Sequence, residues 1–168
     1  MIPNRNKKNF PLYLVSIIFI FPVIVGTVLY YFHDSFNFKT TNHGVLVRPP
    51  ILASYLYPKE EQKKWRIIHV SGKLCDNDCQ KIDYQLQKVQ KALGKNQKRV
   101  AVIALPATFP AVKDLQTAFD KQATHYEVTH KIYLIDPLGN LFMYYPDTTD
   151  PMNVLKDLKK VLEVSQIG

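Results

Sequence analysis

Hydrophobic positions form one long uninterrupted run near the N-terminus, "PLYLVSIIFIFPVIVGTVLYYF", followed by shorter periodic runs. The long run has no charged residue. At about 1.5 Å per residue, a helix of this length spans the roughly 30 Å hydrocarbon core of a bilayer. A cleavable signal sequence has a shorter apolar region and a small-residue cleavage site, which the following "YYFHDSFNF" lacks. We therefore predict an uncleaved transmembrane anchor over residues 11–32, preceded by a short segment 1–10.

The basic residues around the predicted anchor indicate its orientation. Arg5, Lys7 and Lys8 precede the anchor, whereas the next basic residue after it is Lys39. The positive-inside rule places the N-terminus in the cytoplasm and the rest of the chain across the membrane. We expect a single-pass protein of the bacterial inner membrane with a periplasmic C-terminal domain; in a mitochondrion the domain would face the intermembrane space. Both compartments permit disulfide chemistry.

The net charge of +8, from 22 basic and 14 acidic residues, does not indicate a nucleic-acid partner. The charges are interspersed, and the sequence has no basic block or nucleic-acid-binding motif. A solvated surface close to the lipid bilayer is the simpler interpretation.

The pattern of the soluble part changes at Trp65. Residues 33–64 show little periodicity and are interpreted as a connector, in which Pro49 and Pro50 favour extended chain. From Trp65 onward, strand-like runs alternate with runs of helical spacing. The predicted domain covers residues 65–168.

The predicted elements of this domain follow in the order strand, helix, strand, helix, strand, strand, helix. The strands are "WRIIHVSG", "RVAVIAL", "KIYLID" and "NLFMYY", and the turn "PLG" should join the last two in a hairpin. "RVAVIAL" is almost wholly apolar and is expected to be covered on both faces. Each helix has an apolar stripe at helical spacing: Ile82, Leu86, Val89 and Leu93; Val112, Leu115 and Phe119; and Val154, Leu155, Leu158, Val161 and Leu162.

This order of elements is the layout of the thioredoxin fold, an α/β architecture in which helices flank a mixed sheet. We therefore predict a thioredoxin-like domain preceded by one transmembrane helix. The only two cysteines, Cys75 and Cys79, fall after the first predicted strand and at the start of the first predicted helix. The thioredoxin fold keeps its active thiols at this place, although fold alone does not give function.

The motif "CDNDC" is open to three interpretations. A helix N-terminus stabilises a thiolate, which is the form that attacks disulfides and binds soft metals. The C-x3-C spacing is one residue longer than the C-x-x-C of disulfide oxidoreductases, and two thiolates in such a loop can converge on Cu(I). A purely structural disulfide closes so short a ring that its entropic stabilisation is small. We rank metal binding first, with thiol redox chemistry and a structural disulfide as alternatives.

Histidines can complete a metal site. His69 lies inside the first predicted strand and is expected to be packed or hydrogen-bonded. His125 and His130 precede "KIYLID", and the residue before that strand faces the cysteine pair in the thioredoxin fold. Thiol oxidoreductases of this fold normally have a cis-proline there, whereas this chain has no proline between Pro110 and Pro137. His130 is therefore the candidate third ligand, and a general disulfide oxidoreductase is disfavoured.

These residues resemble the Sco/SenC proteins, which are membrane-anchored, thioredoxin-like copper chaperones for the CuA centre of cytochrome c oxidase. The shared features are the single anchor, the C-x3-C motif and a histidine before "YLIDPLGN". The chain is also similar to a small bacterial group described as cytochrome oxidase assembly transmembrane proteins, through "NHGVLVRPP", "CDNDC", "VQKALGK", "YLIDPLGNLFMYYP" and "DLKKVLEVSQIG". Sco proteins usually have prolines beside their cysteines, which this chain lacks.

The resemblance implies an accessory factor for assembly of a haem-copper oxidase rather than an enzyme. Cys75 and Cys79, with His130 as third ligand, would hold Cu(I) and pass it to an oxidase subunit or to another assembly factor. In the second interpretation, the same cysteines form a thiol-disulfide reductase that keeps oxidase cysteines reduced for metallation. The third interpretation is a structural assembly factor without a metal.

Overall fold

The computed structural model describes residues 10–32, 41–61, 63–122, 126–165 and 167. The chain separates into an N-terminal unit, Met1–Thr41, and a C-terminal unit, Asn42–Gly168. The N-terminal unit contains helix α1 (Phe10–Tyr31). Its stretch Tyr13–Tyr31 has a mean hydropathy of 2.3, and none of it is buried. The length and composition of α1 fit the predicted membrane anchor.

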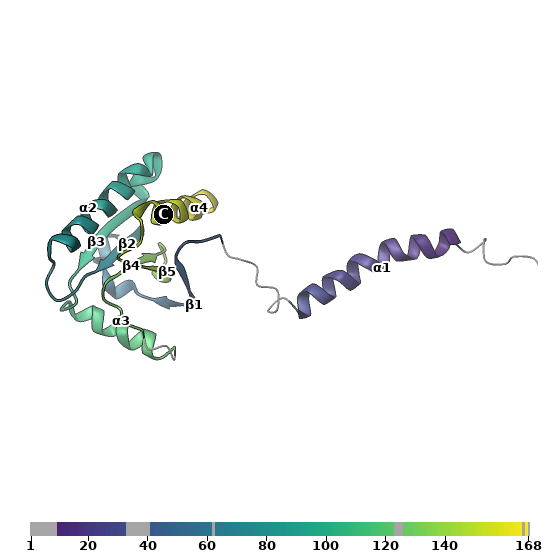
Figure 1. The fold of residues 1–168 in the computed structure, drawn as a ribbon, viewed down its shortest axis with the longest axis horizontal. Coiled ribbons are helices and arrows are strands. Elements are labelled where there is room, and N and C mark those ends of the chain that lie inside the picture. Colours follow the sequence, from purple (N-terminus) through teal and green to yellow (C-terminus); the bar gives the residue numbers. More distant parts are fainter. Residues whose placement is uncertain (1–9, 33–40, 62, 123–125, 166, 168) are drawn as a thin grey trace, which may run out of the picture. The chain divides into compact units, whose positions relative to one another are not determined.

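Within the described residues, the strands of the C-terminal unit form a sheet in the order β1-β5-β4-β2-β3 (Figure 1). The strands are β1 (Val45–Leu52), β2 (Trp65–Val70), β3 (Val100–Leu105), β4 (Lys131–Ile135) and β5 (Asn140–Pro146). β2 is parallel to β3, whereas β4 is antiparallel to both β2 and β5. The predicted mixed sheet and the predicted β4–β5 hairpin are confirmed.

Helices cover both faces of the sheet (Figure 1). On one face lie α2 (Asn77–Ala92) and α4 (Pro151–Val164), and on the other lies α3 (Pro110–Asp120). The predicted apolar stripes form the contacts: Leu86 of α2 packs in one core cluster and Leu115 of α3 in the other. Burying one such side chain stabilises the fold by roughly 1.5–3 kcal/mol, so these stripes determine which face of each helix meets the sheet.

The expected connector, residues 33–64, contains part of the domain. Its residues 45–52 form β1, which pairs with β5 in an antiparallel arrangement. The pairing is irregular between Leu46 and Ile51, where Pro49 and Pro50 supply no N–H donor for a regular ladder. Among the described residues, β1 is the first strand in the order of the sheet, and a sheet tolerates proline at such an edge position.

The prediction that "RVAVIAL" is covered on both faces holds only in part: Val100 packs in one core cluster and Leu105 in the other, but the covering is incomplete. This segment forms β3, the last strand of the sheet among the described residues. Val100 and Leu105 at its ends are buried, but Ala104 is exposed and the residues between are half-buried. Helices packed over the central strands cover an edge strand incompletely. The interior strand β2, which lies between β4 and β3, is buried throughout.

Candidate metal centre

The cysteine pair lies between the end of β2 and the first turn of α2. Cys75 is exposed in the loop, whereas Cys79 in the helix is only 8% exposed. The two are joined by a disulfide, with their Cα atoms 5.2 Å apart. The Asp76 carboxylate accepts a hydrogen bond of 2.9 Å from the Cys79 backbone N–H and so caps the helix. The sequence pattern predicts this position at the start of the helix.

The structure brings His130 and Cys79 to the same cleft, which has a volume of about 530 Å³. His130 directly precedes β4 and has a φ angle of 55°. Its Nδ1 atom lies 3.0 Å from Oδ2 of Asp147, and its side chain is 61% exposed. A Cβ atom placed on Gly72 would lie 3.0 Å from Nε2 of His130, so the imidazole lies against the loop that follows β2. His125, the other histidine before this strand, lies outside the described residues.

The cleft is acidic although the chain as a whole is basic. Among the described residues that line it, the acidic and basic side chains are Asp76, Asp78, Lys81, Asp147 and Asp150. Asp76 caps α2, Asp150 caps α4 and Asp147 pairs with His130, so three of these carboxylates have structural partners. A concave surface with excess negative charge attracts cations. The electrostatics of the cleft therefore suit a positively charged ligand.

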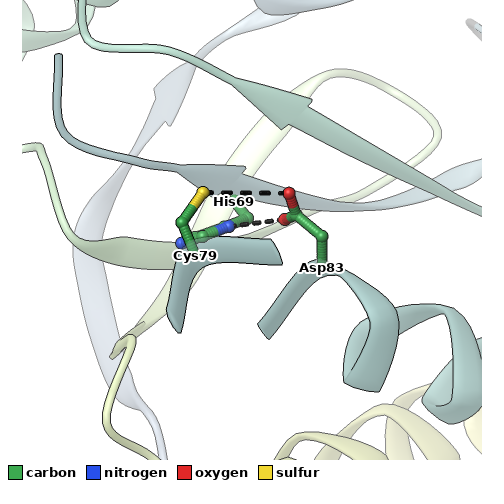
Figure 2. A group of neighbouring side chains, drawn as sticks. All are labelled: His69, Cys79 and Asp83. Atoms are coloured by element: carbon green, nitrogen blue, oxygen red, sulfur yellow. Dashed lines mark hydrogen bonds and ion pairs between the residues drawn. The ribbon is translucent and has the colours of Figure 1, made fainter. Parts of the chain in front are cut away.

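A buried histidine lies next to Cys79. His69 is 1% exposed and lies on the same side of β2 as Ile67, because side chains alternate along a strand. That side faces α2, whose residue Asp83 places Oδ1 at 2.6 Å from Nδ1 of His69. Figure 2 shows the His69 ring between the side chains of Cys79 and Asp83. One ligand atom from each of these three residues lies within 4.8 Å of the other two.

The two ring nitrogens of His69 are in different situations. In the tautomer whose Nδ1–H donates to the Asp83 carboxylate, a neutral imidazole has its lone pair on Nε2. Nε2 is buried and has no hydrogen-bond partner among the described residues. An unpaired buried polar atom costs about 1–3 kcal/mol. The predicted hydrogen bonding of His69 is confirmed for Nδ1, and Nε2 is left as a donor atom for a ligand.

The sequence interpretation missed Asp83. Cys79, Asp83 and Leu86 share one face of α2, because residues three and four apart on a helix are neighbours. A carboxylate on the core-facing stripe of an amphipathic helix needs a polar partner. That signal indicates a partner but does not identify it, since His69 lies on a different element.

Comparisons with known proteins agree with this fold. A family model described as "Transmembrane-like, thioredoxin-like, C-terminal domain" matches residues 65–165. No curated protein matches the sequence. The solution structure of apo Sco1 from Thermus thermophilus matches with a TM-score of 0.53 and 16% sequence identity, over 74% of this chain and 99% of that chain. The family model and this structure confirm the predicted thioredoxin-like fold.

Two further Sco structures match less closely. ScoI from Bradyrhizobium japonicum, with copper bound, has a TM-score of 0.40 and 18% identity over 61% of this chain and 87% of that chain. BsSco, described as a member of the Sco family of cytochrome c oxidase assembly proteins, has a TM-score of 0.42 and 13% identity over 62% of this chain and 84% of that chain. At such identities the likeness concerns the fold alone.

Proposed function

Since this chain belongs to the transmembrane-like, thioredoxin-like C-terminal domain family, we propose that it is a membrane-anchored accessory factor that delivers Cu(I) during assembly of cytochrome c oxidase. The observation that carries the proposal is the cleft that is lined by His130 and by Cys79, which is disulfide-bonded to Cys75. Soft sulfur donors with an imidazole are a donor set suited to Cu(I), and the acidic rim attracts a cation. The Sco-type fold and the resemblance of the cysteine motif support the same reading.

Copper is the cargo in this proposal, and the cysteines bind it only after reduction. A partner dithiol transfers two electrons and two protons to the Cys75–Cys79 disulfide by thiol-disulfide exchange and becomes a disulfide itself. Both thiols release their protons to solvent when they bind the ion as thiolates. His130 supplies the third donor through Nε2, because Asp147 engages its Nδ1.

Transfer of Cu(I) to a partner is expected to begin at the two exposed donors, Cys75 and His130. Cys75 and His130 both reach solvent, whereas Cys79 is buried. Metal ligands of a receiving oxidase subunit can therefore replace Cys75 and His130 one at a time. The protein would act by ligand exchange and not as an enzyme.

The test is a Cu(I) titration of the reduced full chain in detergent micelles against a chromogenic Cu(I) chelator. We expect the wild type to bind one equivalent, Cys75→Ser to lose this binding and His130→Ala to weaken it. His43→Ala is the control, because His43 pairs with Asp157 and does not line the cleft. A wild type that competes no better than Cys75→Ser contradicts the proposal.

The second candidate is a thiol-disulfide reductase that keeps oxidase cysteines reduced. One observation favours it: the disulfide joins an exposed Cys75 to a buried Cys79. After reduction, the Cys75 thiolate would attack a substrate disulfide, and Cys79 would resolve the mixed disulfide. A mixed disulfide with an oxidase subunit, trapped by Cys79→Ser, supports this role. Normal oxidase assembly with both cysteines replaced would leave a structural assembly factor as the remaining interpretation.

A further inference from the structure

We infer that His69 is an additional metal ligand on the inner side of the site and that Asp83 holds it in the coordinating orientation. The inference rests on the proposed function, because it concerns the same Cu(I) ion. It adds His69, a donor on the interior strand β2, to the ligand set of Cys75, Cys79 and His130.

The donor atom is Nε2 of His69. It is buried and has no hydrogen-bond partner among the described residues, whereas Nδ1 of the same ring is 2.6 Å from the Asp83 carboxylate. Metal-binding histidines generally donate their second ring N–H to a carboxylate or carbonyl, which fixes the tautomer and the ring orientation. His69 and Asp83 already have this arrangement.

The position of His69 also suits a ligand. A nitrogen of His69, the sulfur of Cys79 and an oxygen of Asp83 lie within 4.8 Å of one another. In Figure 2, one ring nitrogen of His69 faces Asp83 and the other lies on the Cys79 side. His69 and Cys79 also line the same cleft as His130. Reduction of the disulfide frees the Cys79 sulfur next to this imidazole.

The four donors fall into an inner and an outer pair. Cys79 and His69 are buried, whereas Cys75 and His130 are exposed. A receiving protein meets the outer pair first, and the inner pair holds the ion until exchange is under way. His69 thus retains the ion, and His130 is the histidine that a partner displaces.

X-ray absorption of the Cu(I)-loaded full chain in detergent, reduced with a phosphine, counts the nitrogen donors. The His130→Gln variant decides the question, because His130 is exposed and its replacement leaves His69 and the core in place. We expect this variant to keep one copper–nitrogen scatterer in addition to the sulfurs. A spectrum with sulfur alone would overturn the inference.

Affinity provides a second readout. We expect His69→Gln to weaken Cu(I) binding at least about tenfold and Asp83→Asn by about 10–100-fold, the usual loss when a ligand's outer partner is removed. His43→Gln is the matched control, because it too replaces an imidazole whose Nδ1 pairs with an aspartate, Asp157, at 3.0 Å. This control should bind copper as the wild type does.

The outcomes separate the two proposals. Copper binding that depends on both cysteines but is unchanged in His69→Gln overturns the inference and leaves the proposed function intact. Copper binding that is unchanged when Cys75 and Cys79 are replaced by serine rules out the proposed function, and the inference falls with it.

Discussion

At the scale of single residues, Asp157 fixes the beginning of the domain. This carboxylate is 2% exposed and accepts hydrogen bonds from the backbone N–H groups of His43 at 2.6 Å and Gly44 at 3.1 Å. The His43 imidazole and the Tyr145 hydroxyl also lie 3.0 Å from its oxygens. Burial alone would raise the pKa of Asp157, but these hydrogen bonds outweigh it and lower the pKa below its usual range.

This lowered pKa predicts a loss of stability in acid. The pKa of an unfolded aspartate is about 3.9, so the stabilisation from Asp157 is complete above that pH and is lost as the pH falls through the lower folded value. We expect Asp157→Asn to lower the free energy of unfolding by about 1–3 kcal/mol at pH 7 and by less below pH ~4. Urea unfolding followed by the fluorescence of Trp65, the only tryptophan, measures this. A difference between the two proteins that stays constant with pH would contradict it.

Gly44 predicts a steric effect in the same region. A Cβ atom at this position would lie 2.6 Å from Cε1 of Tyr145 and 2.7 Å from Cγ of Met143. The Tyr145 ring is held by its hydrogen bond to Asp157, so Gly44→Ala should destabilise the domain by about 1–3 kcal/mol in the same unfolding experiment. Gly72→Ala is the control, since the nearest atoms belong to the His130 side chain, which is 61% exposed and gives up only its exposed contact with Asp147 when it moves. Equal effects of the two substitutions would show that the Tyr145 contact is not the cause.

At the scale of elements, hydrophobic periodicity in the sequence predicts the helices whose apolar stripes pack on the sheet. The helices α2, α3 and α4 and the β4–β5 hairpin were accessible to sequence analysis because each carries its own local pattern. β1 was not, because Pro49 and Pro50 interrupt its pattern and its partner β5 is distant in the sequence. The edge position of β3 also depends on sheet order, which local composition does not encode.

The same distinction applies to the candidate site. The position of Cys75 and Cys79 follows from a strand, a loop and a helix that are adjacent in the sequence. The contact between His69 and Asp83 depends on how α2 is rotated over β2, which only the packed structure determines. Periodicity places Asp83 on the core-facing side of α2 but does not say which strand residue it meets.

At the scale of elements, the N-cap of α2 leads to a prediction about stability. The Asp76 side chain accepts the backbone N–H of Cys79, so Asp76→Ala should lower the free energy of unfolding by about 0.5–2 kcal/mol. Asp76→Ser should stay close to the wild type, because a serine hydroxyl can cap the same N–H group. Urea unfolding of the three proteins measures the difference. A serine variant as unstable as the alanine variant would show that the charge of Asp76 matters more than capping.

At the scale of the whole molecule, the chain combines an apolar helix with a thioredoxin-like domain. The helix α1 provides a candidate single-pass anchor, and the domain holds the cysteines, the histidines and the acidic cleft. A disulfide such as Cys75–Cys79 persists in an oxidising compartment outside the cytosol, so the proposed exchange needs the domain to lie there. The orientation of α1 is therefore a condition of the proposed function.

The final prediction concerns this orientation. Alkaline phosphatase, which needs disulfides and is active only after export, should be active when fused to the C-terminus of the full chain in a bacterium. Replacing Arg5, Lys7 and Lys8 by glutamine removes the basic residues that precede the anchor and should lower the phosphatase activity per fusion protein. Lys95→Gln is the control, because this lysine lies too far from the anchor to influence its insertion. An inactive wild-type fusion, together with an active cytoplasmic reporter at the same position, would place the cysteines in the cytosol and exclude a periplasmic copper-delivery role.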